Sequence, residues 1–266
     1  MIRFGLIGKN VSASLSPSIH KAISLETGIK YEYILLDVEK EDIKSIKEIM
    51  KVNELNGVNV TNPYKKITIK YVDKIKSATR KIGATNCIKK EDDDSLSAFN
   101  TDCIGFEMMM YNNSIDISQN NFIVLGSGGA AAAVAYSLAY NDSKSISIFC
   151  RKIGEGIKIK YAVNNTFPDV NIDVDNIDKN FNYHIINCTS AKEIPFNLIG
   201  DIRKDQFLSI IDINYNTKNA YKNIKSINGI DMLIYQAIFS VNYWFEKDLD
   251  KNLDINKIKE RIKNAR

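Results

Sequence analysis

The sequence predicts an α/β protein of two domains, and three observations support this class. Apolar segments of strand length alternate with amphipathic segments of helix length, which is typical of a largely parallel sheet covered by helices. A second alternation begins with a glycine-rich stretch at residues 121–142. The 266 residues, 44% of them hydrophobic, suffice for two modest cores. We expect one domain at residues 1–101 and 231–266, and the other at residues 102–230.

The first domain begins with alternating strands and helices. The runs IRFGLIG, YEYILLDV and LNGVNV are apolar and have the length of buried strands. Between them, SPSIHKAISLE and EDIKSIKEIM carry apolar residues at helical spacing. In chain order, the five segments occupy residues 2–8, 16–26, 31–38, 41–50 and 55–60.

A hairpin is expected next, because the runs NCIKK and SLSAF flank the acidic turn EDDD at residues 91–94. Its closure would bring Asn86 near Asn100, Thr101 and Asp102. These four polar residues would then share one end of the sheet.

The second domain starts with the strand, turn and helix of residues 121–142, and further strands are expected at residues 144–150, 183–188 and 207–213. The last long helix, DMLIYQAIFSVNYWFEK, is broadly apolar. We expect it to return to the first domain together with the tail at residues 254–264.

Composition argues against several classes of function. The net charge is only +4, and the sequence shows no concentrated basic face of the kind that nucleic-acid binding usually needs. No run of about 18 apolar residues predicts a membrane span, and the amino terminus does not resemble a signal peptide. The cysteines are widely spaced without histidine companions, so we expect buried thiols, no metal site and a cytoplasmic location. They are Cys87, Cys103, Cys150 and Cys188.

The best-defined motif lies between the first strand and helix of the second domain. Gly126, Gly128 and Ala131 fill a G-x-G-x-x-A pattern there. In such a turn the first glycine permits the sharp bend, the second lets the backbone approach a pyrophosphate, and the small third residue allows close helix packing. The motif therefore predicts a Rossmann-type dinucleotide-binding domain.

The next strand indicates which dinucleotide is bound. It ends in FCRK, where an NAD enzyme would carry an acidic residue for the ribose 2′-hydroxyl. Arg151 and Lys152 suit a 2′-phosphate instead, which favours NADP. The alternative is that both are solvated residues beyond a strand end.

The stretch NVTNPYKK, residues 59–66, places two lysines after a proline. Pro63 suits the first helical position, with Thr61 or Asn62 as the cap, so Lys65 should fall in the first turn. The helix dipole disfavours a cation there, so a lysine at this position suggests proton transfer or anion binding. A lysine reaching into water is the alternative.

Other candidates also have structural alternatives. Ser14 and Ser16 precede a helix and could bind a carboxylate at its amino terminus, but Ser16 could instead be its N-cap. Asp102 could likewise cap the helix that follows it. Met232 and Gln236 share one helix face, where a core methionine beside a surface glutamine is the ordinary arrangement.

Together these stretches resemble the shikimate dehydrogenase family, in order and along nearly the whole chain. The Ser-x-Ser-Pro motif of the family is matched from Ser14 and its Asn-Val-Thr-x-Pro-x-Lys from Asn59. Its Gly-Ala-x-Asn and Asn-Thr-Asp-x-x-Gly are matched from Gly83 and Asn100. The second domain carries further matches at Gly126 to Ala130, Arg151, Asn187, Thr189, Ile213 and Tyr215, and the closing helix motif is matched by Gly229, Met232 and Gln236.

The resemblance implies an NADP-dependent oxidoreductase that reversibly reduces 3-dehydroshikimate to shikimate, in the pathway to chorismate and aromatic amino acids. Lys65 and Asp102 would form the acid–base pair at the reacting oxygen. The substrate would be bound by Ser14, Ser16, Thr61, Asn86, Asp102, Tyr215 and Gln236. NADP would be bound by Gly126, Ser127, Gly128, Gly129, Ala130, Arg151, Lys152, Thr189, Ile213, Gly229 and Met232.

Some positions depart from the family pattern, and alternatives stay open. Cys150 and Lys152 replace the usual neighbours of Arg151, Asp231 replaces a common glycine, and Leu15 replaces a frequent lysine. Paired serines favour shikimate over quinate. The alternatives are a quinate/shikimate dehydrogenase using NAD and a catalytically idle dinucleotide-binding regulator. We expect a small-molecule substrate, no nucleic acid or membrane partner, and a monomer or homodimer.

Overall fold

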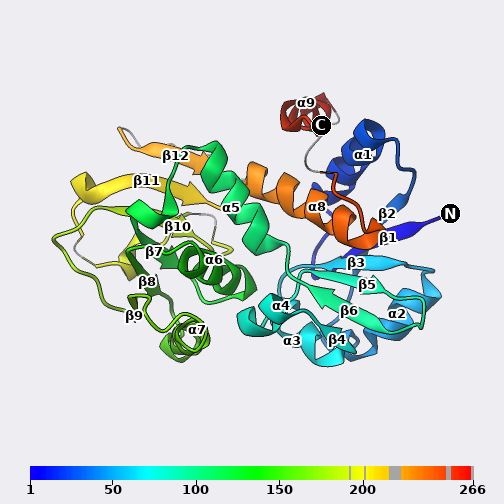
Figure 1. Cartoon of the computed structure of the whole chain (residues 1–266), viewed down its shortest axis with the longest axis horizontal. Helices are drawn as coiled ribbons and strands as arrows, with labels where there is room; N and C mark the ends of the chain where they lie inside the picture. Colours follow the sequence, from blue (N-terminus) through cyan, green and yellow to red (C-terminus); the bar gives the residue numbers. More distant parts are fainter. Residues whose placement is uncertain (192, 201, 216–222, 250–252, 265–266) are drawn as a thin grey trace. The chain divides into compact units, whose positions relative to one another are not determined.

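The computed structural model divides the chain into two compact units (Figure 1). Unit 1 comprises Met1–Gly105 and Leu233–Arg266, and unit 2 comprises Phe106–Met232. The structure describes residues 1–191, 193–200, 202–215, 223–249 and 253–264.

Unit 1 is built on a mixed six-stranded sheet in the order β2-β1-β3-β5-β6-β4. The first three of these pair in parallel, whereas β5 runs antiparallel to both of its neighbours and β4 pairs in parallel with β6. The predicted hairpin is therefore confirmed as β5 and β6. The strands are β1 (Arg3–Gly8), β2 (Glu32–Asp37), β3 (Gly57–Val60), β4 (Lys74–Ile75), β5 (Cys87–Lys90) and β6 (Leu96–Phe99).

The amino-terminal part of unit 1 contributes four helices. The first two alternate with β1, β2 and β3, as the sequence predicts, and the other two follow β3. Isoleucines, valines and a methionine from β1, β3 and the second helix form the core of this part of the sheet. The helices are α1 (Ser16–Thr27), α2 (Ile46–Val52), α3 (Lys65–Thr68) and α4 (Ser77–Ile82), with 3₁₀ turns at Ile43–Ser45 and Ile69–Tyr71.

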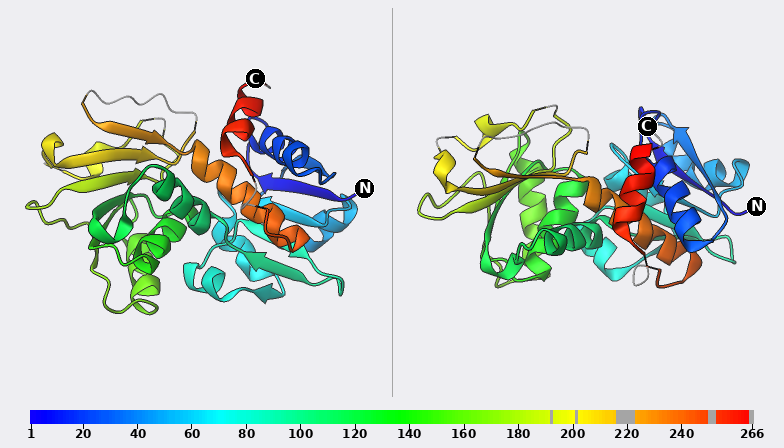
Figure 2. Two further views of the ribbon diagram at one scale, coloured as in Figure 1. Left: turned by 45° about the horizontal axis from the view of Figure 1, so that its top comes forward. Right: turned by 90° about the horizontal axis from the view of Figure 1, so that it is seen from above.

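The carboxyl-terminal helices are α8 (Ile230–Phe245), which begins in unit 2 and belongs to unit 1 from Leu233 on, and α9 (Ile255–Asn264) in unit 1. The indole of Trp244 stacks on Phe4 with 4.1 Å between ring centroids, and its N–H donates to the backbone oxygen of Ile88 at 2.9 Å. Figure 2 shows α9 beside α1, and the two helices are in contact. The apolar faces of the last two helices are thus buried on residues from the start of the chain.

Unit 2 holds a second six-stranded sheet, in the order β12-β11-β10-β7-β8-β9, in which every pair is parallel (Figure 1). The central strands are almost wholly buried, which explains their continuous apolar sequence. The strands are β7 (Asn121–Leu125), β8 (Ser145–Phe149), β9 (Ile172–Val174), β10 (Tyr183–Asn187), β11 (Phe207–Asp212) and β12 (Lys225–Asn228).

The helices of unit 2 are α5 (Asp102–Asn112), which begins in unit 1, α6 (Gly129–Tyr140) and α7 (Ile153–Asn164). Three 3₁₀ turns lie at Ile117–Gln119, Phe196–Leu198 and Lys204–Gln206. The alanine-rich face of α6 is buried, with Ala131 fully inaccessible to solvent. Small side chains there allow the helix to lie close to the sheet.

Two further observations concern the whole of the described chain. None of its helices combines the length and the apolar character that crossing a bilayer requires. All four cysteines are free thiols, and Cys188 is partly exposed whereas the other three are buried. The expectation of buried thiols therefore holds for three positions and is wrong for Cys188.

Candidate active site

The direction of β5 gathers polar residues from distant parts of unit 1. Because β5 is antiparallel to β3 and β6, the residue that precedes it lies beside the residues that follow the other two strands. The backbone oxygen of Asn86 accepts from Val60 N at 2.9 Å, and its side-chain Oδ1 accepts from Thr101 N at 2.7 Å. The backbone oxygen of Lys65 accepts from Thr85 N at 2.9 Å. The predicted approach of Asn86 to Thr101 and Asp102 is confirmed.

An ion pair stands at the centre of this cluster. Lys65 Nζ lies 2.7 Å from Asp102 Oδ2, and only 17% and 5% of the two side chains are exposed. The second oxygen, Asp102 Oδ1, accepts from Asn86 Nδ2 at 2.9 Å. Both carboxylate oxygens are therefore engaged, and the ammonium group is held at a defined position with limited access to water.

Helix α3 begins later than the sequence suggests. Its first residue is Lys65 and its N-cap is Tyr64, with no side-chain cap. Pro63 follows a cis peptide bond in a turn that Tyr64 N closes on Thr61 O at 2.9 Å. The predictions that Pro63 opens the helix and that Thr61 or Asn62 caps it are wrong, whereas Lys65 does fall in the first turn.

The two serines are close together at the start of α1. Ser14 Oγ lies 3.1 Å from Ser16 Oγ and accepts from Ser16 N at 3.2 Å. The cap position belongs to Leu15, which makes no side-chain cap bond, so the alternative of Ser16 as N-cap is wrong. The two hydroxyls therefore face each other at the amino terminus of α1, where Ser14 Oγ also accepts from the first backbone N–H of the helix.

The alternatives for Asp102 and Gln236 also fail. Asp102 is the first residue of α5 rather than the residue before it, and its carboxylate bonds to Lys65 and Asn86. Gln236 in α8 is buried, with Oε1 accepting from Asn86 Nδ2 at 3.3 Å and Nε2 donating to Leu233 O at 2.8 Å. It is therefore part of the cluster and not a surface residue.

Thr61 lies just beyond β3, against the end of β1. A Cβ added at Gly8 would lie 2.4 Å from Thr61 Cγ2, so a larger residue at position 8 would displace the side chain of Thr61. Tyr215 and Met232 belong to unit 2, and the roles expected for them beside the substrate stay predictions.

The glycine-rich turn of unit 2 has the predicted strand–turn–helix context, between β7 and α6. Gly126 has φ of +113°, and a Cβ there would lie 3.2 Å from Cys188 O, so only glycine fits without strain. Gly128 is the N-cap of α6, and nothing lies within 4 Å of where its Cβ would be. The space beside Gly128 is compatible with a pyrophosphate at the amino terminus of α6, and that binding stays a prediction.

The two cations predicted for the 2′-phosphate follow β8. Arg151 and Lys152 are both exposed, and neither forms an ion pair with another residue of the described ranges. The structure therefore fits a binding role and the solvated alternative equally well.

Polar residues at the ends of β10 and β11 form a network in which sequence analysis named Asn187 and Thr189 and missed Asp212 and Asn214. Asp212 Oδ1 accepts from Asn187 Nδ2 at 3.1 Å and from Asn214 Nδ2 at 3.0 Å. Asn214 also donates to Thr189 O at 2.8 Å, and Thr189 Oγ1 donates to Asn187 Oδ1 at 2.7 Å. The shared position of these residues, at the carboxyl ends of adjacent parallel strands, was the available signal.

Two other predicted cofactor residues are in contact. A Cβ at Gly229 would lie only 2.0 Å from Ile213 O, so the chain after β12 passes directly over the end of β11. Any other residue at position 229 would displace this backbone.

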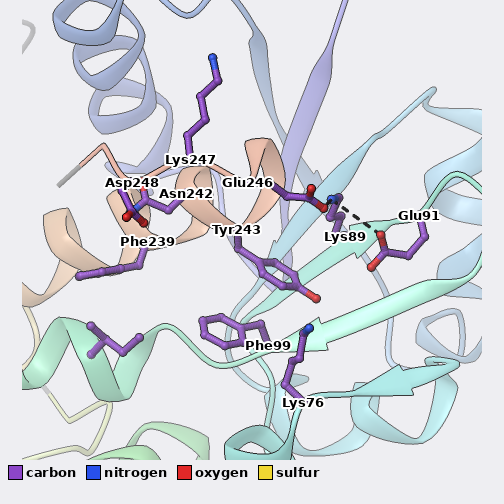
Figure 3. Close-up of a pocket in the computed structure, with 11 residues that line it drawn as sticks. Lys76, Lys89, Glu91, Phe99, Phe239, Asn242, Tyr243, Glu246, Lys247 and Asp248 are labelled. Atoms are coloured by element: carbon purple, nitrogen blue, oxygen red, sulfur yellow. Dashed lines mark hydrogen bonds and ion pairs between the residues drawn. The ribbon is translucent and has the colours of Figure 1, made fainter. Parts of the chain in front are cut away.

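Unit 1 also contains a hollow of about 440 Å³ outside the cluster (Figure 3). The rings of Phe99 and Tyr243 stack there with 4.9 Å between centroids, and Lys89 Nζ lies 3.7 Å from Glu91 Oε2 on its rim. The described residues that line it include none of those predicted to bind substrate.

These features define a two-domain α/β protein of the dinucleotide-binding class. The glycine-rich turn lies in unit 2, and the buried lysine–carboxylate pair lies in unit 1. The model of the shikimate dehydrogenase substrate binding domain matches residues 6–88. A shikimate dehydrogenase (NADP(+)) of Clostridium beijerinckii is 35% identical, over 94% of each chain. One from Methanocaldococcus jannaschii is 32% identical, over 95% of this chain and 94% of its own.

The fold agrees with these relatives. A crystal structure of a shikimate dehydrogenase in complex with NADP+ superposes with a TM-score of 0.84 at 30% identity, covering 100% of this chain and 96% of that one. The chain therefore belongs to the shikimate dehydrogenase family, and the resemblance predicted from the sequence is confirmed.

Proposed function

We propose that the chain is an NADP-dependent shikimate dehydrogenase that reversibly reduces 3-dehydroshikimate to shikimate, in the pathway to chorismate and aromatic amino acids. The observation that carries this proposal is the buried contact of 2.7 Å between Lys65 Nζ and Asp102 Oδ2. A ketone reduction needs a proton donor at the carbonyl oxygen, and a fixed ammonium group supplies one. The family relationship supports the choice of substrate.

The substrate-binding proposal follows the polar atoms of unit 1. The adjacent hydroxyls of Ser14 and Ser16, at the amino terminus of α1, suit a carboxylate. Thr61, Asn86, Asp102 and Gln236 would bind ring hydroxyls, together with Tyr215 of unit 2.

In the mechanism that we propose, Lys65 acts at the ketone oxygen. NADPH, when bound, supplies the hydride that forms the new C–H bond at the ketone carbon. The carbonyl oxygen then takes a proton from Lys65 Nζ, which leaves the lysine neutral until solvent reprotonates it. Asp102 keeps the ammonium group aimed at this oxygen.

The cofactor residues proposed in unit 2 fit a phosphorylated dinucleotide. The open backbone of Gly126, Ser127, Gly128, Gly129 and Ala130 would hold the pyrophosphate. Arg151 and Lys152 would bind the 2′-phosphate. Thr189, Ile213, Gly229 and Met232 would line the nicotinamide side.

An assay panel tests the proposal. Purified protein is incubated with shikimate or quinate and with NADP or NAD, and reduced cofactor is read by absorbance. We expect the highest kcat/KM with shikimate and NADP. Higher kcat/KM with quinate and NAD would favour the quinate/shikimate alternative, and no turnover in any combination would favour a catalytically idle regulator. We further propose a cytoplasmic enzyme that works as a monomer or homodimer, which size-exclusion chromatography with light scattering resolves.

A further inference from the structure

We propose that Ser240 is a positioning residue for the Lys65–Asp102 pair, a role that rests on the proposed function. Ser240 lies in α8, four residues after Gln236, and is fully buried. Its hydroxyl contacts side chains from β3 and from the start of α5, as well as the backbone of its own helix. The directions of these hydrogen bonds connect it to Asp102.

The orientation of Asn59, in β3, is determined by its neighbours. Asn59 Nδ2 lies 3.1 Å from the backbone oxygen of Asn86, which can only accept a hydrogen bond. Its Oδ1 accepts from the hydroxyl of Tyr33 at 2.8 Å. The amide nitrogen therefore also faces Ser240 Oγ, to which it donates at 2.8 Å.

The single proton of the Ser240 hydroxyl is also committed. Ser240 Oγ lies 2.8 Å from the backbone oxygen of Gln236, and this carbonyl can only accept. Ser240 consequently has no proton left for Thr101 Oγ1, which is 3.2 Å away. Thr101 must be the donor in that contact, and Ser240 the acceptor.

The side chain of Asn86 connects the hydroxyl of Thr101 to the ion pair. Its Oδ1 accepts from the backbone N–H of Thr101 at 2.7 Å, so its amide nitrogen is the group that faces the other way. Its two protons are directed to the nearest acceptors, Thr101 Oγ1 at 2.8 Å and Asp102 Oδ1 at 2.9 Å, and the contact with Gln236 Oε1 at 3.3 Å is longer. A directed chain therefore runs from Asn86 through Thr101 to Ser240.

This chain restricts the carboxylate of Asp102. One of its oxygens is held by Lys65 and the other by Asn86, whose amide is oriented in part by Thr101. Thr101, Asn86 and Ser240 are each at most 1% exposed, so water does not replace a lost partner. Without the oxygen of Ser240, the hydroxyl proton of Thr101 lacks its acceptor, so the hydroxyl that accepts from Asn86 Nδ2 is no longer held in one orientation.

The test compares three variants with the wild type, which is first assayed with shikimate and NADP. Ser240→Ala removes the acceptor, Thr101→Val removes the donor, and the double variant removes both. We expect each single variant to lower kcat about tenfold, because a small displacement of the reacting groups is costly, while KM for shikimate changes by less than about threefold. The double variant should be no slower than either single variant, because both break the same link.

A matched control separates positioning from general loss of stability. Ser24 in α1 also bonds to a backbone carbonyl, that of Ile29 at 2.6 Å, and lies outside the cluster. Ser24→Ala should lower Tm by as much as the cluster variants or less, and leave kcat unchanged. The fold of every variant is checked by circular dichroism and its Tm is measured. The kcat values are then determined at least about 15 °C below the lowest Tm, where nearly all of the protein is folded.

The outcomes are distinct. A wild type that does not turn over shikimate overturns the proposed function, and the role of Ser240 falls with it. An active wild type with unchanged kcat in Ser240→Ala overturns the positioning role alone. So does a double variant whose loss is the product of the single losses. If Ser240→Ala does not fold, Thr101→Val decides from the other side of the same contact, because retained kcat in that variant contradicts the proposal.

Discussion

The two sheets of this protein place their functional groups in different ways. In unit 2 all strands are parallel, so every strand ends at the same edge and the loops there present backbone N–H groups and exposed cations. In unit 1, β5 runs against β3 and β6, so residues before one strand meet residues after two others. The result is a buried cluster of side chains around Lys65 and Asp102.

Because of this difference, we expect substitutions in the two units to have different consequences. A cluster of buried side chains has no substitute for a lost group, because water does not enter to replace it. Backbone groups at a helix start are retained in most substitutions, and an exposed cation is partly replaced by solvent. We therefore expect catalytic rate to depend mainly on unit 1, and cofactor affinity to depend on unit 2.

The largest effect is expected at Lys65. Lys65→Ala should lower kcat by about 10²–10⁴-fold with a modest change in KM, because it removes the proposed proton donor. Lys66→Ala is the matched control, since consecutive helical residues point about 100° apart and only one can face the reacting atom. Steady-state kinetics of both variants decide the point, and near-normal turnover of Lys65→Ala would remove this residue from the mechanism.

A smaller effect is expected at Arg151 in unit 2. Arg151→Ala should reduce the ratio of kcat/KM for NADP over NAD by about 10–100-fold, because charge-assisted bonds to the 2′-phosphate are lost. KM for shikimate should not change. Arg203→Ala provides the control, since Arg203 is an exposed arginine of unit 2 that pairs with Asp205 at 3.4 Å. An unaltered NADP preference in Arg151→Ala would support the solvated alternative.

Substitution in the glycine-rich turn tests whether the stability and the NADP binding of unit 2 depend on backbone conformation. Gly126→Ala should lower the free energy of unfolding by about 1–2 kcal/mol, because φ of +113° is unfavourable for a residue with a Cβ. It should also weaken NADP binding. Gly154→Ala, in α7 with nothing within 4 Å of the added Cβ, should be neutral or slightly stabilising. Chemical denaturation and isothermal calorimetry measure both, and equal stability of the two variants would contradict the argument.

The two histidines, one in each unit, give no effect at neutral pH and an effect that grows as the pH falls. Burial lowers the pKa of His20 to about 3, and burial together with the charge of Lys225 lowers the pKa of His184 to about 4. Each imidazole stays neutral in the folded protein, whereas the unfolded chain binds a proton below pH 6.5. Stability is therefore complete above pH 6.5 and falls by up to about 1.4 kcal/mol per pH unit and histidine as the pH drops.

Substitution identifies the contribution of each histidine. The loss should continue to about pH 3 for His20 and stop near pH 4 for His184. Denaturation of His20→Gln and His184→Gln from pH 7 to pH 5 should show a shallower decline than the wild type in both cases. An unchanged decline in either variant would mean that the histidine concerned is protonated in the folded protein.

Sequence patterns predicted the elements that have strong local signals. The buried strands, the glycine turn and the β5–β6 hairpin were all recognised from periodicity and turn residues. The helix α7 was not, and neither were the short strands β9 and β12, since three or four residues at a sheet edge carry little apolar pattern. The helix start at Lys65 was placed too early, because a proline suits a turn as well as a first helical position.

The amino-acid sequence was sufficient for the class of fold, the glycine turn and the candidate residues, because these depend on neighbours within a few positions. The partners of those residues depended on the folded chain. Asn59 and Ser240 are 181 positions apart, and only the register of β3 and the packing of α8 bring their polar atoms to 2.8 Å. Burial then gives each hydrogen bond a single possible direction, and no local pattern encodes that direction.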